Sequence, residues 1–240
     1  MFKRLFHTLL LLLIVTMPLW VGSKYLMQMF NMALIYLIIV MGLNYVIGFC
    51  GQVSFAQTAF WGIGAYISAL LTLRLGISFW VALPLSALGT TIAGVVIGFP
   101  TLRLKQFYLG IATIGFGEIV NLILLNWTSL TGGSIGIPGI PKPKIGNFVI
   151  RNDFQFYYIL LAVTLVLFFV TIFIKNSRFG RGLLAIGDDE LAAEVMGVPT
   201  HKYKIKAFAL SAFYAGAAGS LYAHLISYIS PDLFIFRQSI

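Results

Sequence analysis

The sequence has little charge for its length. Only 10% of its 240 residues are Asp, Glu, Lys or Arg, whereas 60% are hydrophobic and the mean hydropathy is +0.96. A soluble domain carries about 25% charged residues, so this chain has too little polar surface to cover a water-soluble globule. We therefore exclude a cytosolic enzyme, and the abundance of Phe, Leu and Ile also excludes a disordered chain. The composition indicates a multi-pass membrane protein.

Motifs for several kinds of chemistry are missing as well. One cysteine, Cys50, rules out an internal disulfide, and its neighbours offer no basic group to activate the thiol, which we expect to be inert. No HExxH motif or Cys/His cluster occurs, so no metal site is predicted. The sequence also lacks G-x-x-x-x-G-K-[ST] and any Gly-Lys pair, so it has no phosphate cradle of an ATPase. We expect no bound cofactor and no catalytic residues.

Long apolar runs predict an all-α transmembrane bundle of about seven spans, because about 20 apolar residues cross a bilayer. Lys3 and Arg4 before the first run would also suit a signal peptide, but the nearby Pro18-Leu19-Trp20 looks like an interfacial exit and favours a retained span. We treat residues 1–240 as one transmembrane domain surrounded by membrane lipid. The runs are Leu5–Val21, Leu26–Ile47, Ser54–Leu73, Ile77–Phe99, Phe107–Trp127, Phe154–Ile174 and Lys206–Tyr228.

The distribution of Lys and Arg predicts the orientation. If the N-terminus lies in the cytoplasm, basic residues are more numerous on the cytoplasmic side, in agreement with the positive-inside rule. Although the net charge is +9, these residues are scattered between apolar runs and form no continuous basic face, which argues against nucleic-acid binding. The segment Lys175–Lys206 holds most of the cytoplasmic ones: Lys175, Arg178, Arg181, Lys202, Lys204 and Lys206.

This cytoplasmic segment contains a predicted short helix. Asp188 is a candidate N-cap, and Asp189 and Glu190 place negative charge at the positive end of the helix dipole. Gly197 is a natural C-terminal residue and Pro199 a stop signal. About nine residues are too few for a stable isolated helix, so it must dock on its own bundle, on the membrane surface or on a cytoplasmic partner. Its apolar stripe consists of Leu191, Ala192, Val195 and Met196.

Uncharged polar residues gather between the second and third runs. Gly48–Val53 breaks the apolar pattern, and Gln52, Ser54, Gln57 and Thr58 lie around the start of the third run. A helix that begins inside the membrane points its N–H groups and its positive end inwards, which suits a substrate carboxylate. Polar residues at a helix start are also ordinary caps, so both interpretations stay open.

Glu118 is the only acidic residue inside a predicted span. A charged side chain at the bilayer centre costs at least about 2.5–3.5 kcal/mol, so we expect Glu118 to face the bundle interior, with a partner or protonated. It is either a pathway or gating residue or an interhelical hydrogen-bond partner of Asn121, Gln57 or a backbone group. His224, alone near the outer end of the last run, is expected to be a packing histidine.

The Gly/Pro-rich stretch Thr131–Pro143 is predicted to lack regular structure and contains a hydrolase-like motif. Gly132–Gly136 (GGSIG) matches the G-x-S-x-G of serine hydrolases, which makes an intramembrane serine protease using Ser134 a competing function. That motif needs a strand–turn–helix or a serine on a helix inside the bundle. Ser134 instead lies among helix breakers with no base nearby in the sequence, so this function is a remote alternative.

Four blocks, in order, resemble the permease subunits of bacterial branched-chain amino acid ABC transporters. The resemblance covers nearly the whole chain from Asn44 onwards. The blocks are Tyr45–Tyr66 (YVIGFCGQVSFAQTAFWGIGAY), Thr101–Ile119 (TLRLKQFYLGIATIGFGEI), Thr131–Pro141 (TGGSIGIPGIP) and Ser177–Tyr222, which is similar to the cytoplasmic loop and following helix of the family.

The resemblance implies the other parts of a transporter. A second homologous permease subunit would pair with this chain in the bacterial inner membrane. Two cytoplasmic ATP-binding subunits would use the ATP, and a periplasmic or lipid-anchored binding protein would deliver leucine, isoleucine or valine. Lys175–Lys206 would be the coupling loop, and ATPase closure would push its helix and rock the bundle around a midplane cavity. We expect Gln52, Ser54, Gln57 and Glu118 to line that cavity. The coupling helix would comprise Asp188, Asp189, Glu190, Leu191, Ala192, Ala193, Glu194, Val195, Met196 and Gly197.

Departures from the family pattern leave alternatives open. Gly187-Asp188-Asp189 stands where members often carry an Arg-Glu-Asn or Arg-Asp-Asp run, which puts an arginine contact to the ATPase in doubt. Family members continue past the position of Ile240 with a Gly-rich segment and further spans, so we expect the C-terminal spans to be missing here. The motifs do not separate leucine-type from urea- or amide-type permeases. An ion-coupled secondary transporter using Glu118 is the alternative of a different class.

Overall fold

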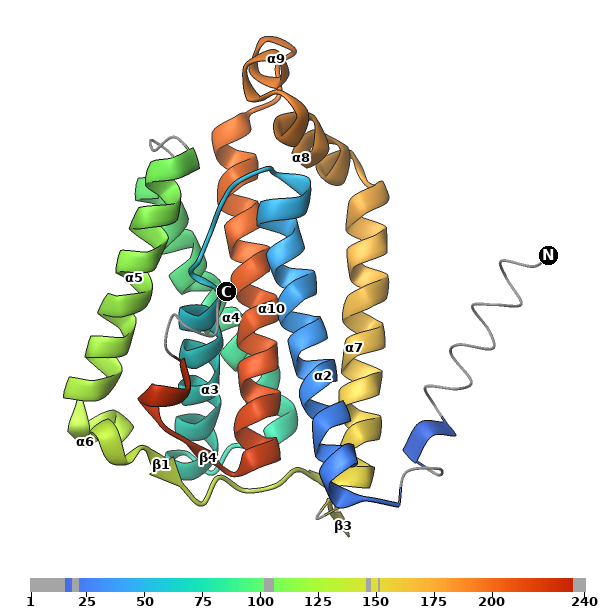
Figure 1. Ribbon diagram of the computed structural model, residues 1–240, viewed down its shortest axis with the longest axis vertical. Coiled ribbons are helices and arrows are strands. Elements are labelled where there is room, and N and C mark those ends of the chain that lie inside the picture. The colour runs from blue at the N-terminus through green and yellow to red at the C-terminus, as the bar shows by residue number, and fades with distance from the viewer. Residues whose placement is uncertain (1–15, 19–21, 102–105, 146–147, 151, 235–240) are drawn as a thin grey trace.

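The computed structural model describes residues 16–18, 22–101, 106–145, 148–150 and 152–234. Long helices stand side by side in a bundle, and a short helical cap lies at one end (Figure 1). The all-α fold class predicted from the sequence is confirmed. The long helices are α2 (Lys24–Asn44), α3 (Gln57–Arg74), α4 (Phe79–Thr101), α5 (Gln106–Asn126), α7 (Asp153–Asn176) and α10 (Thr200–Ile226), and the cap consists of α8 (Arg178–Asp188) and α9 (Glu190–Val195).

Short elements complete the connections at the opposite end of the bundle from α9 (Figure 1). Thr131–Pro143 was predicted to be irregular but contains β1, which pairs antiparallel with β4 so that Ile137 lies opposite Ile229. This pairing joins distant parts of the chain, and no local sequence pattern reveals it. The elements are α6 (Thr128–Thr131), η2 (Gly133–Ile135), β1 (Ile137–Pro138), the hairpin of β2 (Lys144–Ile145) and β3 (Phe148–Val149), β4 (Tyr228–Ile229) and η3 (Pro231–Phe234).

α10 is the central helix of the bundle and packs against α4, α3 and α2. Nearly every residue from Ser211 to Leu225 is buried. A methyl group added at Gly64 of α3 would lie 2.4 Å from the Cα of Gly216, so the two backbones approach closely enough to exclude any side chain there. Small residues therefore let α3 and α10 cross closely at this point.

Within the described part of the chain, four segments are long and apolar enough to cross a membrane: Lys24–Phe49, Phe79–Phe99, Tyr108–Asn126 and Asp153–Asn176. They coincide with four of the predicted runs, and the chain is a multi-pass membrane protein. α3 and α10 occupy two further predicted runs but are less apolar, because small and polar residues replace aliphatic ones in the bundle interior. The first run lies mostly outside the described residues. The seven-span count, the cytoplasmic N-terminus and the single-domain boundary stay predictions.

The connection between α2 and α3 positions the polar residues. A π-helical turn, η1 (Tyr45–Phe49), extends α2, and no helix forms again until Gln57. Figure 1 shows this light-blue connection running back beside α10, so that α3 begins partway along the bundle. We call residues Gln52–Gln57 the polar segment.

Candidate functional site

The polar segment brings three of the four predicted pathway residues together inside the bundle. Gln52, Ser54 and Gln57 are 4%, 6% and 5% exposed. Gln57 joins two helices, because its Nε2 donates to the Ile39 carbonyl of α2 at 3.0 Å and its Oε1 accepts from the Ser211 hydroxyl of α10 at 2.8 Å. A side chain that satisfies both its donor and its acceptor across helices fixes the start of α3.

A second set of contacts holds the polar segment against α5. The Phe55 N–H donates to Thr113 Oγ1 at 3.0 Å, and Thr113 in turn donates to the Gly110 carbonyl at 2.8 Å. A methyl group added at Gly110 would lie 3.5 Å from both Val53 and Phe55, which is ordinary packing distance. The polar segment is therefore wedged between α5 on one side and α2 and α10 on the other.

The geometry supports both interpretations of these residues. The hydroxyl of Ser54 accepts from the Ala56 N–H at 3.4 Å, a local turn bond typical of residues before a helix. At the same time, α3 begins inside the bundle, so the positive end of its dipole points into the interior. Such an end, with the Gln52 and Ser54 side chains beside it, is chemically suited to a carboxylate.

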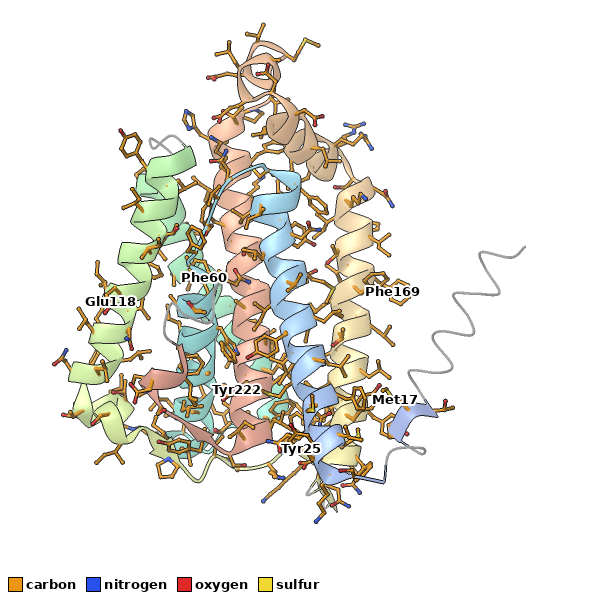
Figure 2. The ribbon with its side chains drawn as sticks, viewed as in Figure 1. Met17, Tyr25, Phe60, Glu118, Phe169 and Tyr222 are labelled. Carbon is orange, nitrogen blue, oxygen red and sulfur yellow. The ribbon has the colours of Figure 1, made fainter. Side chains whose placement is uncertain are left out.

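Glu118 does not join this group. Its side chain is exposed, and Figure 2 shows it on the side of α5 away from the bundle. Among the described residues none forms a hydrogen bond or an ion pair with it, so the expected contacts with Asn121 or Gln57 are not made. The physical reason is that Gly110, Thr113 and Phe116 form the inner face of α5, and Glu118 falls on the opposite side.

The predicted short helix exists, but its cap is one residue later than expected. Asp188 continues α8, whose buried face includes Leu183 and Ile186. Asp189 instead turns into extended conformation, and its Oδ1 accepts from the Leu191 and Ala192 N–H groups at 2.9 and 3.0 Å. At the other end Gly197 adopts φ +84°, which confirms the predicted glycine stop.

The helix α9 presents its apolar residues to the outside. Leu191, Val195 and Met196 are 75%, 82% and 84% exposed, and we call these three side chains the apolar tip. Only Ala193 of this helix is buried. The base is anchored, since Glu190 forms an ion pair with the buried Lys204 of α10. α9 is thus a firmly held helix whose apolar side does not pack on the described part of its own bundle.

Sequence reasoning missed α8. The Ser177 hydroxyl accepts from the Gly180 N–H at 3.2 Å and caps the helix, and Gly180, Leu183 and Ile186 form its buried face. Both signals were present in the sequence: a serine before the first turn and apolar residues at helical spacing.

Other candidates have structural roles. His224 is fully buried, with Nδ1 2.6 Å from the Pro141 carbonyl and Nε2 3.0 Å from the Ser68 hydroxyl, as expected of a packing histidine. Ser134 lies exposed in the turn η2, and His224 does not serve it as a base, because both ring nitrogens of His224 are engaged with Pro141 and Ser68. Burial raises the pKa of the Cys50 thiol to about 12, in line with an inert cysteine. No metal-binding cluster occurs among the described residues.

Similarity to known proteins settles the family. Residues 25–240 match the family model of the permease component of branched-chain amino acid transport systems. The chain belongs to this family. No solved structure matches it significantly.

The individual relatives that the chain resembles are also named as transport permease proteins. The chain is 37% identical to the high-affinity branched-chain amino acid transport system permease protein LivM of Escherichia coli K12, over 99% of this chain and 61% of the relative. It is 26% identical to the permease protein LivH of Salmonella typhimurium LT2, over 86% of this chain and 73% of the relative. A putative glucose ABC transporter permease, TsgC13 of Haloferax volcanii, is 37% identical over 48% of this chain and 33% of its own length. This family member therefore spans 61% of the length of the LivM protein.

Proposed function

We propose that the chain is a membrane-spanning permease subunit of an ABC importer that carries leucine, isoleucine and valine across the bacterial inner membrane. Its family and the names of its LivM and LivH relatives support this function. In this proposal the chain is no enzyme and binds no cofactor, because partner subunits use the ATP. The partners are a second homologous permease subunit, two cytoplasmic ATP-binding subunits and a periplasmic or lipid-anchored binding protein.

The apolar tip is the observation that carries this proposal. Two large apolar side chains of the six-residue helix α9, and a third at its C-cap Met196, stand more than 70% exposed, while the N-cap at Asp189 and the Glu190–Lys204 ion pair hold that helix in place. Exposed apolar groups on a rigid support mark an interaction surface. We assign this surface to a groove of the ATP-binding subunit, so that closure of the ATPases pushes α9 and drives alternating access.

We place the substrate path at the polar segment. An aliphatic amino acid needs a few polar anchors for its ammonium and carboxylate groups within an apolar wall. Gln52, Ser54 and Gln57, together with the start of α3, offer donors for the carboxylate. Glu118, on the side of α5 away from the polar segment, is proposed to contribute to the path only where α5 meets a further part of the transporter.

Capture of the ATP-binding subunit tests this function. The native complex is solubilised in detergent and the permease chain is pulled down, first unmutated and then as Val195→Asp/Met196→Asp. Two buried carboxylates in an apolar groove are strongly unfavourable, so the ATPase should be recovered with the unmutated chain and lost with the double variant, and leucine uptake should disappear with it. Val195→Leu/Met196→Leu keeps the tip apolar and is the matched control. Equal recovery of the ATPase with the Asp variant would overturn the proposal.

The exposed Glu118 favours one second candidate, an ion-coupled secondary transporter. A carboxylate in the middle of a span is a common coupling group for protons or cations. Such a carrier would not need the apolar tip, so the Asp double variant would keep its uptake.

The identity of the solute is tested separately. Competition by urea, amides and glucose against the uptake of labelled leucine distinguishes the substrates within the family.

A further inference from the structure

The helical cap formed by α8 and α9 contacts the chain just before the polar segment through two glycines. Gly187 lies near the end of α8, and Gly51 immediately precedes Gln52. A methyl group added at Gly51 would lie 3.2 Å from both the Cα and the carbonyl oxygen of Gly187. One added at Gly187 would lie 2.6 Å from the Phe49 carbonyl oxygen. Because these neighbours are backbone atoms, they cannot rotate away, and the contact is backbone against backbone.

Gly187 is rigidly connected to the apolar tip. Asp188 alone separates it from Asp189, the N-cap of α9. The Asp189 N–H donates to the Ala185 carbonyl at 3.1 Å, which carries the hydrogen bonding of α8 up to that cap. No loop exists between the two helices to absorb a displacement. A push on α9 must therefore move Gly187 as well.

Gly51 is equally well connected on its own side. The next residue, Gln52, donates its N–H to the Val46 carbonyl at 2.9 Å, so the chain around Gly51 is held to η1. Four residues after Gly51, Phe55 bonds to Thr113 of α5, and two residues later Gln57 bonds to α2 and α10. A displacement of Gly51 would therefore also move the buried polar residues and the helices bonded to them, α2, α5 and α10.

We infer that Gly187 is a positioning residue: its contact with Gly51 transmits the displacement of α9 to the polar segment. This inference rests on the proposed function, since it takes the ATP-binding subunit as the source of the push. Glycine is required on both sides, because any side chain would separate α8 from the loop. Gly51 also adopts φ +65°, a conformation that only glycine takes up readily.

The test is Gly187→Ala in the complete transporter, reconstituted with its ATP-binding subunits and binding protein in liposomes. The apolar tip is unchanged, so the ATPase should copurify and ATP hydrolysis should stay within about twofold, whereas leucine uptake should fall about tenfold, a typical loss for a broken coupling contact. The ATP hydrolysed per leucine transported should rise accordingly.

Gly98→Ala in α4 is the matched control, because its added methyl group would lie 3.5 Å from Phe208, at ordinary packing distance. A merely structural effect would lower hydrolysis and uptake together and leave their ratio unchanged, and this result would overturn the inference. Unchanged uptake by Gly187→Ala would overturn it too. Failure of the proposed function has a different signature: the unmutated complex itself would show no ATP-driven leucine uptake.

Discussion

α10 and α5 use glycine in opposite ways. In α10 the glycines mark close contacts with neighbouring helices: a methyl group at Gly216 would lie 2.5 Å from Thr90 Oγ1, and one at Gly219 would lie 2.2 Å from the Trp61 carbonyl oxygen. In α5, methyl groups at Gly115 and Gly117 would meet nothing within 4 Å. The same residue type thus closes the centre of the bundle, whereas at two positions of α5 it meets no neighbour.

The difference explains which helices look like membrane spans. α10 and α3 are shielded by their neighbours, so they can be built from small and polar residues that pack and hydrogen-bond. α5 has to be apolar because much of its surface is exposed, including Ile111, Ile119 and Leu122. Burial inside a membrane bundle therefore lowers the hydrophobicity of a helix, the reverse of the rule for soluble proteins.

Gly64→Ala should lower the stability of the protein more than the other substitutions that test this comparison. Its methyl group would be driven into the Cα of Gly216 at 2.4 Å, and overpacking of this kind costs about 3 kcal/mol. Gly115→Ala is the matched control on α5 and should leave stability unchanged or raise it by about 0.5–1 kcal/mol, the helix preference of Ala over Gly. Thermal unfolding of the purified protein in detergent measures both. Equal losses from the two variants would show that α5 is packed as closely as the centre.

His224→Leu should cause the next largest loss of stability, because it removes two hydrogen bonds of a buried side chain in α10. A carbonyl only accepts, so His224 Nδ1 donates to Pro141, and in the neutral ring Nε2 accepts from the Ser68 hydroxyl. Loss of both bonds should cost about 1–3 kcal/mol, again measured by thermal unfolding. The control is Tyr228→Phe, which removes an exposed bond from Tyr228 to the Ile135 carbonyl in the same outer region. If the control lost as much stability, burial would not be the cause.

The centre and periphery also differ in how far the sequence predicts them. The helices follow from long apolar runs, and α7, predicted at Phe154–Ile174, extends from Asp153 to Asn176. The clustering of Gln52, Ser54 and Gln57 follows from a break in the apolar pattern, which forces the polar groups to find partners inside the bundle. Chain continuity places these three residues close together, so a local signal was sufficient.

The inward face of α5 could not be predicted in this way. α5 is apolar all round, and a helix without a polar face gives no periodicity from which its buried side can be read. The position of Glu118 is set by distant contacts, namely Phe55 with Thr113 and Phe60 with Phe116. The cap at Asp189 was missed for a related reason: the packing of α8, and not the local sequence, decides which of two adjacent aspartates ends a helix.

Glu118→Gln is the substitution with the smallest expected effect. It tests whether ATP hydrolysis or ion coupling through Glu118 drives leucine uptake. If ATP hydrolysis drives uptake, a neutral side chain of the same shape should change leucine uptake by about two- to threefold, which is less than about 1 kcal/mol. Dissipation of the proton gradient in liposomes supplied with ATP should have no effect on either form. Gln57→Leu provides the central counterpart, because it removes two interhelical bonds and should reduce uptake more strongly. Loss of concentrative uptake in Glu118→Gln, with downhill transport retained, would instead identify this carboxylate as the coupling group of an ion-driven carrier.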